Sequence, residues 1–240
     1  MRARVVESYR GFPLTDPLFT NYGGNRPVSR SVNMMQATRD VPTKAEATAA
    51  RIIAAAKRLF VASNYADVTT DMIARAAEVT KGGLYHHFTS KEQLYISMMI
   101  GDLDHKRCLF EQAVAMDGDC RTRLARLTRD FLELPDEERA LTRLVRRDIN
   151  TFVDDERDHL VRAYQRALPE QIEAIISDGI RDGELAAGDA RILSWSFVAL
   201  VEVVIGQYAD LALGSTETRL NHVLDLFFDG TAAKPTGGTA

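Results

Sequence analysis

Residues 69–88 read TTDMIARAAEVTKGGLYHHF, and this stretch decides the expected fold. Apolar residues recur at helical spacing on both sides of a break near Val79. Thr70 and Thr80 each stand where a threonine can cap a helix. Two short helices joined by a tight turn, with a small shared core, are typical of a helix-turn-helix. The residues expected to face that core are Ile73, Ala74, Ala77, Val79, Leu84 and Phe88.

The second helix of this motif offers an unusual surface to solvent. Its first turn contains Gly82 and Gly83, and each glycine costs roughly 1 kcal/mol relative to alanine inside a helix. Bare backbone allows close approach to DNA, and its N–H groups can face phosphate. Lys81 adds charge, and Tyr85 adds hydrogen bonding and flat contact surface. We therefore expect a recognition helix, with DNA contacts from Thr69, Thr70, Thr80, Lys81, Gly82, Gly83, Tyr85, His86, His87 and Lys91. For His87 a structural role against the first helix of the domain is an equally good interpretation.

A longer pattern surrounds the motif. It consists of residues 52–60 (IIAAAKRLF), Tyr65, residues 69–88 and residues 91–94 (KEQL). Over this range the chain closely resembles the tetracycline-repressor (TetR) family. The resemblance implies a three-helix DNA-binding domain, a variable ligand domain and a homodimer formed by the last two helices. Gly83 stands where the family more often carries Ser, Thr or Ala, so the role of position 83 stays open.

Charge is distributed unevenly along the chain, whose formal net charge is −4. Residues 1–42 carry six basic residues (Lys or Arg) and three acidic residues (Asp or Glu). Residues 43–100 carry seven basic and five acidic residues. Residues 101–240 carry seventeen basic and twenty-six acidic residues. A basic N-terminal part and an acidic C-terminal part suit a protein that contacts the phosphates of DNA with its N-terminal part only.

The pattern predicts an all-α chain in four parts. Residues 1–42 are rich in Pro and Gly without any period, and we expect a disordered extension; Met34 and Met35 would be alternative starts. Residues 43–89 form the DNA-binding domain, residues 90–230 the ligand-binding and dimerisation domain, and residues 231–240 a loose tail. Thr43 and Glu46 can form a capping box. Further helices are expected at 43–64, 90–114, 121–134, 137–152, 155–182 with a kink at Pro169, 189–213 and 216–228.

Several classes of protein are not expected. No apolar run reaches the ~20 residues of a membrane-spanning helix, and the first residues have no signal-peptide pattern. Cys108 and Cys120 are the only two cysteines, which fits a reducing cytoplasm better than a disulfide framework. There is no nucleophile elbow, phosphate-binding loop or HExxH motif, so neither catalysis nor a cofactor is predicted.

The ligand domain contains one helix that is apolar almost all round, at residues 189–213. Such a helix is either core, or a dimer interface on one face and a pocket wall on the other. Glu202 in its middle needs an arginine partner or a ligand. An apolar pocket with few polar groups suits an amphipathic organic effector, such as a lipid-like acid or an aromatic compound. The candidate lining residues are His105, Phe131, Arg146, Asn150, Phe152, Trp195 and Glu202.

The sequence thus favours a ligand-responsive regulator, most often a repressor, that binds a palindromic operator as a dimer and is released by a small molecule. A metal sensor of the same fold is a second hypothesis. His105 with Cys108, and Asp155 with His159, have spacings that can bind a metal, but no third ligand is evident. The sequence also leaves open an enzyme with a pocket in the helical domain and a DNA-binding module without a ligand.

Overall fold

The computed structural model describes residues 43–229, and the regular structure in this range is entirely helical. The expectations for residues 1–42 and 230–240 lie outside the described residues. The elements in chain order are α2 (Lys44–Ala62), α3 (Thr70–Ala76), α4 (Lys81–His87), α5 (Lys91–Ala115), α6 (Cys120–Leu132), α7 (Asp136–Asp148), η2 (Ile149–Thr151), α8 (Asp154–Ala167), α9 (Pro169–Arg181), α10 (Ala190–Val204), α11 (Gln207–Leu213) and α12 (Thr216–Asp229).

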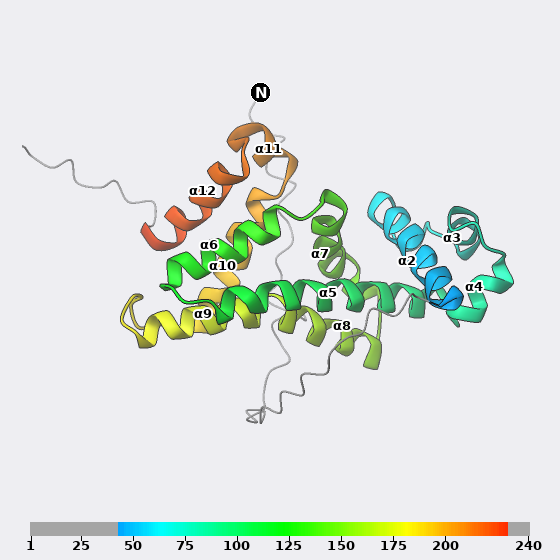
Figure 1. Ribbon diagram of the computed structural model, residues 1–240, viewed down its shortest axis with the longest axis horizontal. Helices are drawn as coiled ribbons and strands as arrows, with labels where there is room; N and C mark the ends of the chain where they lie inside the picture. The colour runs from blue at the N-terminus through cyan, green and yellow to red at the C-terminus, as the bar shows by residue number, and fades with distance from the viewer. Residues whose placement is uncertain (1–42, 230–240) are drawn as a thin grey trace, which may run out of the picture.

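One long helix joins the two ends of the molecule (Figure 1). The head, formed by α2, α3 and α4, lies at one end, and α5 extends from it past the remaining helices. With 25 residues, α5 is about 37 Å long at the usual rise per residue. It contacts α2 in the head and α6, α7, α8 and α9 in the larger part. A shift of α5 relative to its neighbours would therefore move the head.

Several helices begin where a polar side chain accepts a hydrogen bond from a free backbone N–H group. Thr43 and Glu46 form the predicted capping box at α2. Thr80 and Ser90 cap α4 and α5 through the N–H groups of Gly83 and Gln93. At α3 the predicted cap is wrong by one residue. Thr69 accepts the bond from the Met72 N–H, whereas Thr70 is the first residue of the helix.

Two predicted helices are each divided. The segment 155–182 forms α8 and α9, because Pro169 lacks an N–H group and begins a new helix after Leu168, whose backbone is not helical. The segment 189–213 forms α10 and α11, which are separated at Ile205 and Gly206. The second half of the chain is therefore more segmented than its hydropathy pattern predicts.

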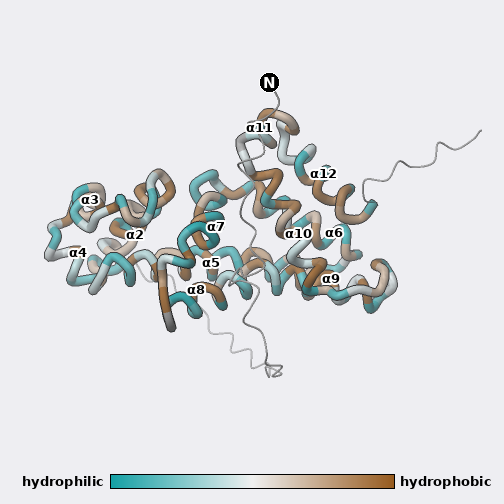
Figure 2. Tube along the Cα trace, turned by 180° about the vertical axis from the view of Figure 1, so that it is seen from behind, coloured by the Kyte–Doolittle hydropathy of each residue, from teal (hydrophilic) through white to brown (hydrophobic). Residues whose placement is uncertain are grey.

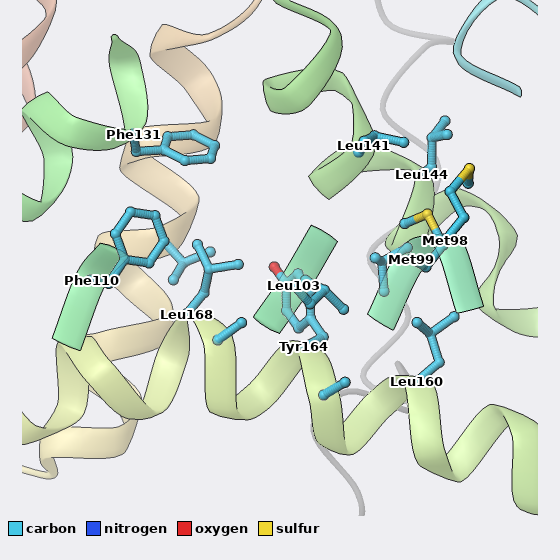
Figure 3. Close-up of a cluster of buried hydrophobic side chains, with 14 of the residues drawn as sticks. Met98, Met99, Leu103, Phe110, Phe131, Leu141, Leu144, Leu160, Tyr164 and Leu168 are labelled. Atoms are coloured by element: carbon cyan, nitrogen blue, oxygen red, sulfur yellow. The ribbon is translucent and has the colours of Figure 1, made fainter. Parts of the chain in front are cut away.

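The buried apolar residues form one cluster that reaches from the head to α12. Figure 2 shows hydrophobic segments, in brown, in helices along this whole length. At the head, Phe60, Tyr65, Tyr95 and Phe152 form an aromatic cluster with ring centroids 4.8 to 5.8 Å apart. Farther along α5, the close-up in Figure 3 shows Leu103 and Phe110 among side chains from the helices on either side. The head and the larger part thus share one core, which gives a physical connection between them.

Candidate nucleic-acid interface and internal cavity

The helix-turn-helix consists of α3, a turn and α4. Ile73, Ala74 and Leu84 are buried between the two helices and the rest of the head. Ala77 is also buried, and its small side chain lets α4 pass close to α3. Glu78 in the turn has a φ of 55°, a left-handed conformation that favours glycine. The motif is therefore held by a compact core and contains one unfavourable backbone position.

The outer face of α4 carries the residues predicted to meet DNA. Lys81, Gly82 and His86 are exposed, and the Tyr85 side chain is 43 % exposed although it is large and aromatic. No atom beyond its own turn lies within 4 Å of where a Gly82 Cβ would be, so the backbone is open to solvent there. This face can contact phosphates with Lys81 and base edges with Tyr85 and His86.

Two contacts hold this face in place from α3. The Tyr85 and Thr70 hydroxyl groups lie 3.3 Å apart, within hydrogen-bonding distance. The Lys81 ammonium donates to the Asp71 carboxylate at 3.0 Å, and this hydrogen bond raises the pKa of Lys81. Both partners of the ion pair are about half exposed, so the pair is weak in water and can exchange for a phosphate.

Several predicted DNA contacts are already engaged within the protein. Thr69 and Thr80 use their side-chain oxygens as helix caps. A Cβ at position 83 would lie 3.2 Å from the Thr80 oxygen, so glycine there leaves the cap uncrowded. His87 is half-buried, which fits the structural role considered for it.

Lys91 differs most from the expectation. Its ammonium donates to the carbonyl oxygens of Tyr65 and Val68 at 2.8 and 3.0 Å. It also lies 4.1 Å from the centroid of the Tyr65 ring. The side chain therefore fixes the start of α5 to the loop after α2. Sequence spacing placed Lys91 correctly at a helix start but could not show which way its side chain points.

A cavity lies inside the larger part of the protein, between α6, α7, α8, α9 and α10. The volume of this cavity is only about 20 Å³. A space of this size holds about one water molecule. The lining is mostly apolar and comprises Leu127, Thr128, Phe131, Thr142, Arg143, Tyr164, Leu168, Ile172, Val198, Val201, Glu202 and Ile205.

The structure brings only some of the predicted pocket residues to this cavity. Phe131 and Glu202 line it, and Arg146 forms an ion pair with Glu202, as the need for a partner predicted. Trp195 lies behind the wall, with its ring 6.2 Å from the ring of Tyr164. His105 and Asn150 are exposed, and Phe152 belongs to the aromatic cluster at the head; these three do not line the cavity.

Sequence reasoning also missed the polar lining. Thr128 and Thr142 face the cavity, but a single threonine on an amphipathic helix gives no signal of its own. Among residues 43–229 no group of three or more His, Cys, Asp or Glu is arranged to hold a metal ion. In the same range, no helix combines the length and apolar character needed to cross a membrane.

Comparison with known proteins agrees with this geometry. Residues 52–98 match the family model described as bacterial regulatory proteins of the tetR family, and residues 117–209 match a tetracyclin repressor-like C-terminal domain. The transcriptional repressor KstR2 of Rhodococcus jostii is 25 % identical over 179 residues, which cover 74 % of this chain and 88 % of the relative.

Solved structures share the fold. FadR of Bacillus subtilis, solved in complex with stearoyl-CoA, has a TM-score of 0.65 at 19 % identity and covers 76 % of this chain and 99 % of its own. AibR, solved with isovaleryl coenzyme A and operator DNA, has a TM-score of 0.65 at 21 % identity and covers 75 % of this chain and 98 % of its own. With matches over both the head and the larger helical part, the chain belongs to the TetR family and is a transcriptional regulator, not an enzyme.

Proposed function

We propose that this protein is a dimeric repressor that binds a palindromic operator with one α4 helix per half-site and is released by a hydrophobic or amphipathic effector. The observation that carries the DNA-binding part is the exposed face of α4, where an open glycine backbone lies between Lys81 and Tyr85. A helix of this kind fits the major groove, and symmetric half-sites match a two-fold dimer.

We assign the DNA contacts to two groups. Lys81, Gly82, Tyr85 and His86 would make the direct contacts, because they are exposed on one face. The helix N-termini at Thr69 and Thr80 would face the sugar-phosphate backbone of the DNA. Thr70 would hold the Tyr85 hydroxyl group in position. Lys91 would act indirectly by positioning α5.

The dimer interface is proposed on the outer face of α10, next to α12. Ile192, Ser196, Ala199 and Val203 are exposed at spacings of four, three and four residues, which forms a single stripe. Ile192 and Val203 are 65 % and 69 % exposed in the single chain. Small residues in the middle of the stripe would let a second α10 approach closely, and apolar residues at its ends would be buried. Tyr208 and Leu211 on α11, both more than 80 % exposed, extend the apolar surface.

The effector site is proposed in the cavity between α6, α7, α8, α9 and α10. Its apolar lining supports a hydrocarbon-containing ligand. Acyl-CoA molecules are bound in the related FadR and AibR structures, and they are the first class to test. Because the cavity is narrow, an effector would have to push α7 or α10 outward, and a shift of α7 would reach the head.

Operator binding is tested by selecting sequences from genomic DNA fragments and titrating the selected fragment by fluorescence anisotropy. We expect an inverted repeat, an affinity that falls steeply with salt, and release by stearoyl-CoA or isovaleryl-CoA. Selection of no common sequence would contradict specific operator binding. Unchanged DNA affinity with both acyl-CoA probes would leave the DNA-binding assignment intact but remove acyl-CoA as the effector class.

A further inference from the structure

Two threonine hydroxyl groups in the cavity wall have no hydrogen-bond partner among the described residues. Thr128 on α6 is 0 % exposed and Thr142 on α7 is 5 % exposed. Neither Oγ1 atom makes a hydrogen bond within residues 43–229. Both residues line the cavity, and they approach it from different helices.

Such hydroxyl groups are costly in a folded protein. A buried hydroxyl without a partner loses its hydrogen bonds to water, at a cost of about 1–3 kcal/mol. A threonine in a helix usually relieves this cost by donating to the carbonyl four residues earlier. For Thr142 that carbonyl belongs to Glu138, and it already accepts a 2.7 Å hydrogen bond from the buried Lys106 ammonium. Thr142 therefore has a hydroxyl group without a partner in a residue that lines the cavity.

The rest of the lining indicates what kind of ligand group these hydroxyl groups can hydrogen-bond with. Leu127, Phe131, Ile172, Val198 and Val201 provide hydrocarbon surface around them. An uncharged oxygen atom attached to a hydrocarbon body would match this combination, because a hydroxyl can donate to a carbonyl and can both donate to and accept from an alcohol.

The charged groups of the lining oppose a free carboxylate. Glu202 adds a carboxylate to the same lining, and Arg146 is already paired with it. Arg143 is exposed, and its guanidinium donates to the Ile205 carbonyl at 3.0 Å. One acidic and one basic side chain in the lining leave little net attraction for an anion, while desolvation of a carboxylate is expensive.

We infer that the effector carries an uncharged carbonyl or hydroxyl oxygen that hydrogen-bonds with Thr128 and Thr142, while its hydrocarbon part fills the apolar lining. The inference rests on the effector site proposed above. It covers ketones, esters, thioesters and alcohols and excludes the free acid. The two threonines are specificity-determining residues, because they would distinguish a neutral oxygen from both a carboxylate and a plain hydrocarbon.

Direct binding of three eight-carbon probes to the DNA-free protein tests this. The probes are 2-octanone, octanoate and octane, and binding is followed by the fluorescence of Trp195, the single tryptophan, which stacks beside the cavity residue Tyr164. We expect 2-octanone to bind at least about tenfold more tightly than either of the others, which corresponds to ~1.4 kcal/mol. Tighter binding of octanoate, equal binding of ketone and hydrocarbon, or no binding of any probe would overturn the inference.

Variants locate the effect on the hydroxyl groups. Thr128→Val and Thr142→Val keep the side-chain shape and should each reduce 2-octanone affinity about tenfold without affecting octane. Thr128→Ser keeps the hydroxyl and should retain the preference for the ketone. Thr122→Val on the exposed face of α6 is the matched control for probe binding and should leave the affinities for all three probes unchanged.

The thermal stability of the unliganded variants gives a second readout. A buried hydroxyl without a partner contributes nothing favourable to the free protein, so both valine variants should melt at the same or a higher temperature. A lower melting temperature, with the ketone preference intact, would show that the threonines hold an ordered water only and would overturn the inference. Operator release is measured separately: ketone binding without release would contradict the proposed function but not this assignment.

Discussion

The Tyr95 phenol on α5 donates a 2.7 Å hydrogen bond to the Asp148 carboxylate at the end of α7, in the protein interior. The neighbouring Arg147 donates two bonds of 2.7 Å to the same carboxylate. The Arg147 guanidinium also lies 3.4 Å from the carbonyl oxygens of Phe60 and Ser63, where α2 ends. The end of α7 is thus bonded to the long helix and to the head.

The remaining residues of α7 extend this connection to the cavity. Thr142 and Arg143 line the cavity, and Arg146 is paired with Glu202. A ligand that moves α7 would therefore disturb the contacts of Asp148 and Arg147 with the head. This arrangement gives a physical route from effector to operator affinity.

Tyr95→Phe should lower the free energy of unfolding by about 1–2 kcal/mol at pH 7, because a buried hydrogen bond to a charged group is lost. Urea denaturation of the DNA-free protein measures this, and Tyr85→Phe, at an exposed side chain of α4, is the control. A loss no larger than that of the control would show that Arg147 alone satisfies Asp148.

The same pair predicts a dependence on alkaline pH. Burial, followed by the hydrogen bond to Asp148, raises the pKa of Tyr95 well above its usual value. Above pH ~10 the unfolded chain releases the phenol proton first, so stability is full below that pH and falls as pH rises. Tyr95→Phe should show a smaller loss of stability than the unmodified protein as the pH rises from about 9 to about 11. An identical loss of stability in both proteins would contradict the assignment of this pH dependence to Tyr95. Burial also raises the pKa of Tyr65 to about 12, and the contribution of Tyr65 to the pH dependence is present in both proteins.

Lys81→Ala and Asp71→Asn should change operator affinity in opposite directions. The first removes a phosphate contact and should reduce the salt dependence of binding by about one released ion. The second removes the carboxylate that holds Lys81 in the free protein, so affinity should rise a few-fold. Anisotropy titrations over a range of salt measure both, with Arg162→Ala on the exposed face of α8 as control. A weaker complex with Asp71→Asn would show that the ion pair positions Lys81 instead of competing for it.

Glu78→Gly should raise the free energy of unfolding by up to about 1 kcal/mol, because residue 78 has a φ of 55° and glycine carries no Cβ penalty there. Glu78→Val should lower it by about 1–2 kcal/mol, since a branched side chain is least tolerated in this conformation. Glu133→Gly, at an exposed position with a φ of −83°, should give no gain. A stabilising Glu78→Val variant would refute the strain argument. Thermal unfolding is the measurement.

Ser196→Glu should convert the dimer to a monomer and abolish operator binding, because it places a charge in the middle of the proposed α10 stripe. Ser177→Glu on the exposed face of α9 is the matched control. Analytical ultracentrifugation gives the oligomeric state, and circular dichroism checks that the helices persist. A dimer that survives the substitution would place the interface elsewhere.

The sequence by itself determined the features that depend on neighbouring residues. The capping box of Thr43 and Glu46, the two helices of the motif and the outward face of Lys81 and Tyr85 follow from spacings of three and four residues. The need of Glu202 for an arginine partner or a ligand also followed from local reasoning, since a carboxylate in an apolar helix must be compensated, and Arg146 is the partner in the structure.

Only the tertiary structure decided which distant residues meet. Thr128, Thr142 and Val198 come from three helices, and the packing of those helices placed them around one cavity while His105 and Asn150 stayed at the surface. The same packing turned Lys91 inward to two carbonyl oxygens. Helical periodicity gives the direction of a side chain relative to its own axis, but not the rotation of that axis against its neighbours, which the summed contacts of the whole core determine.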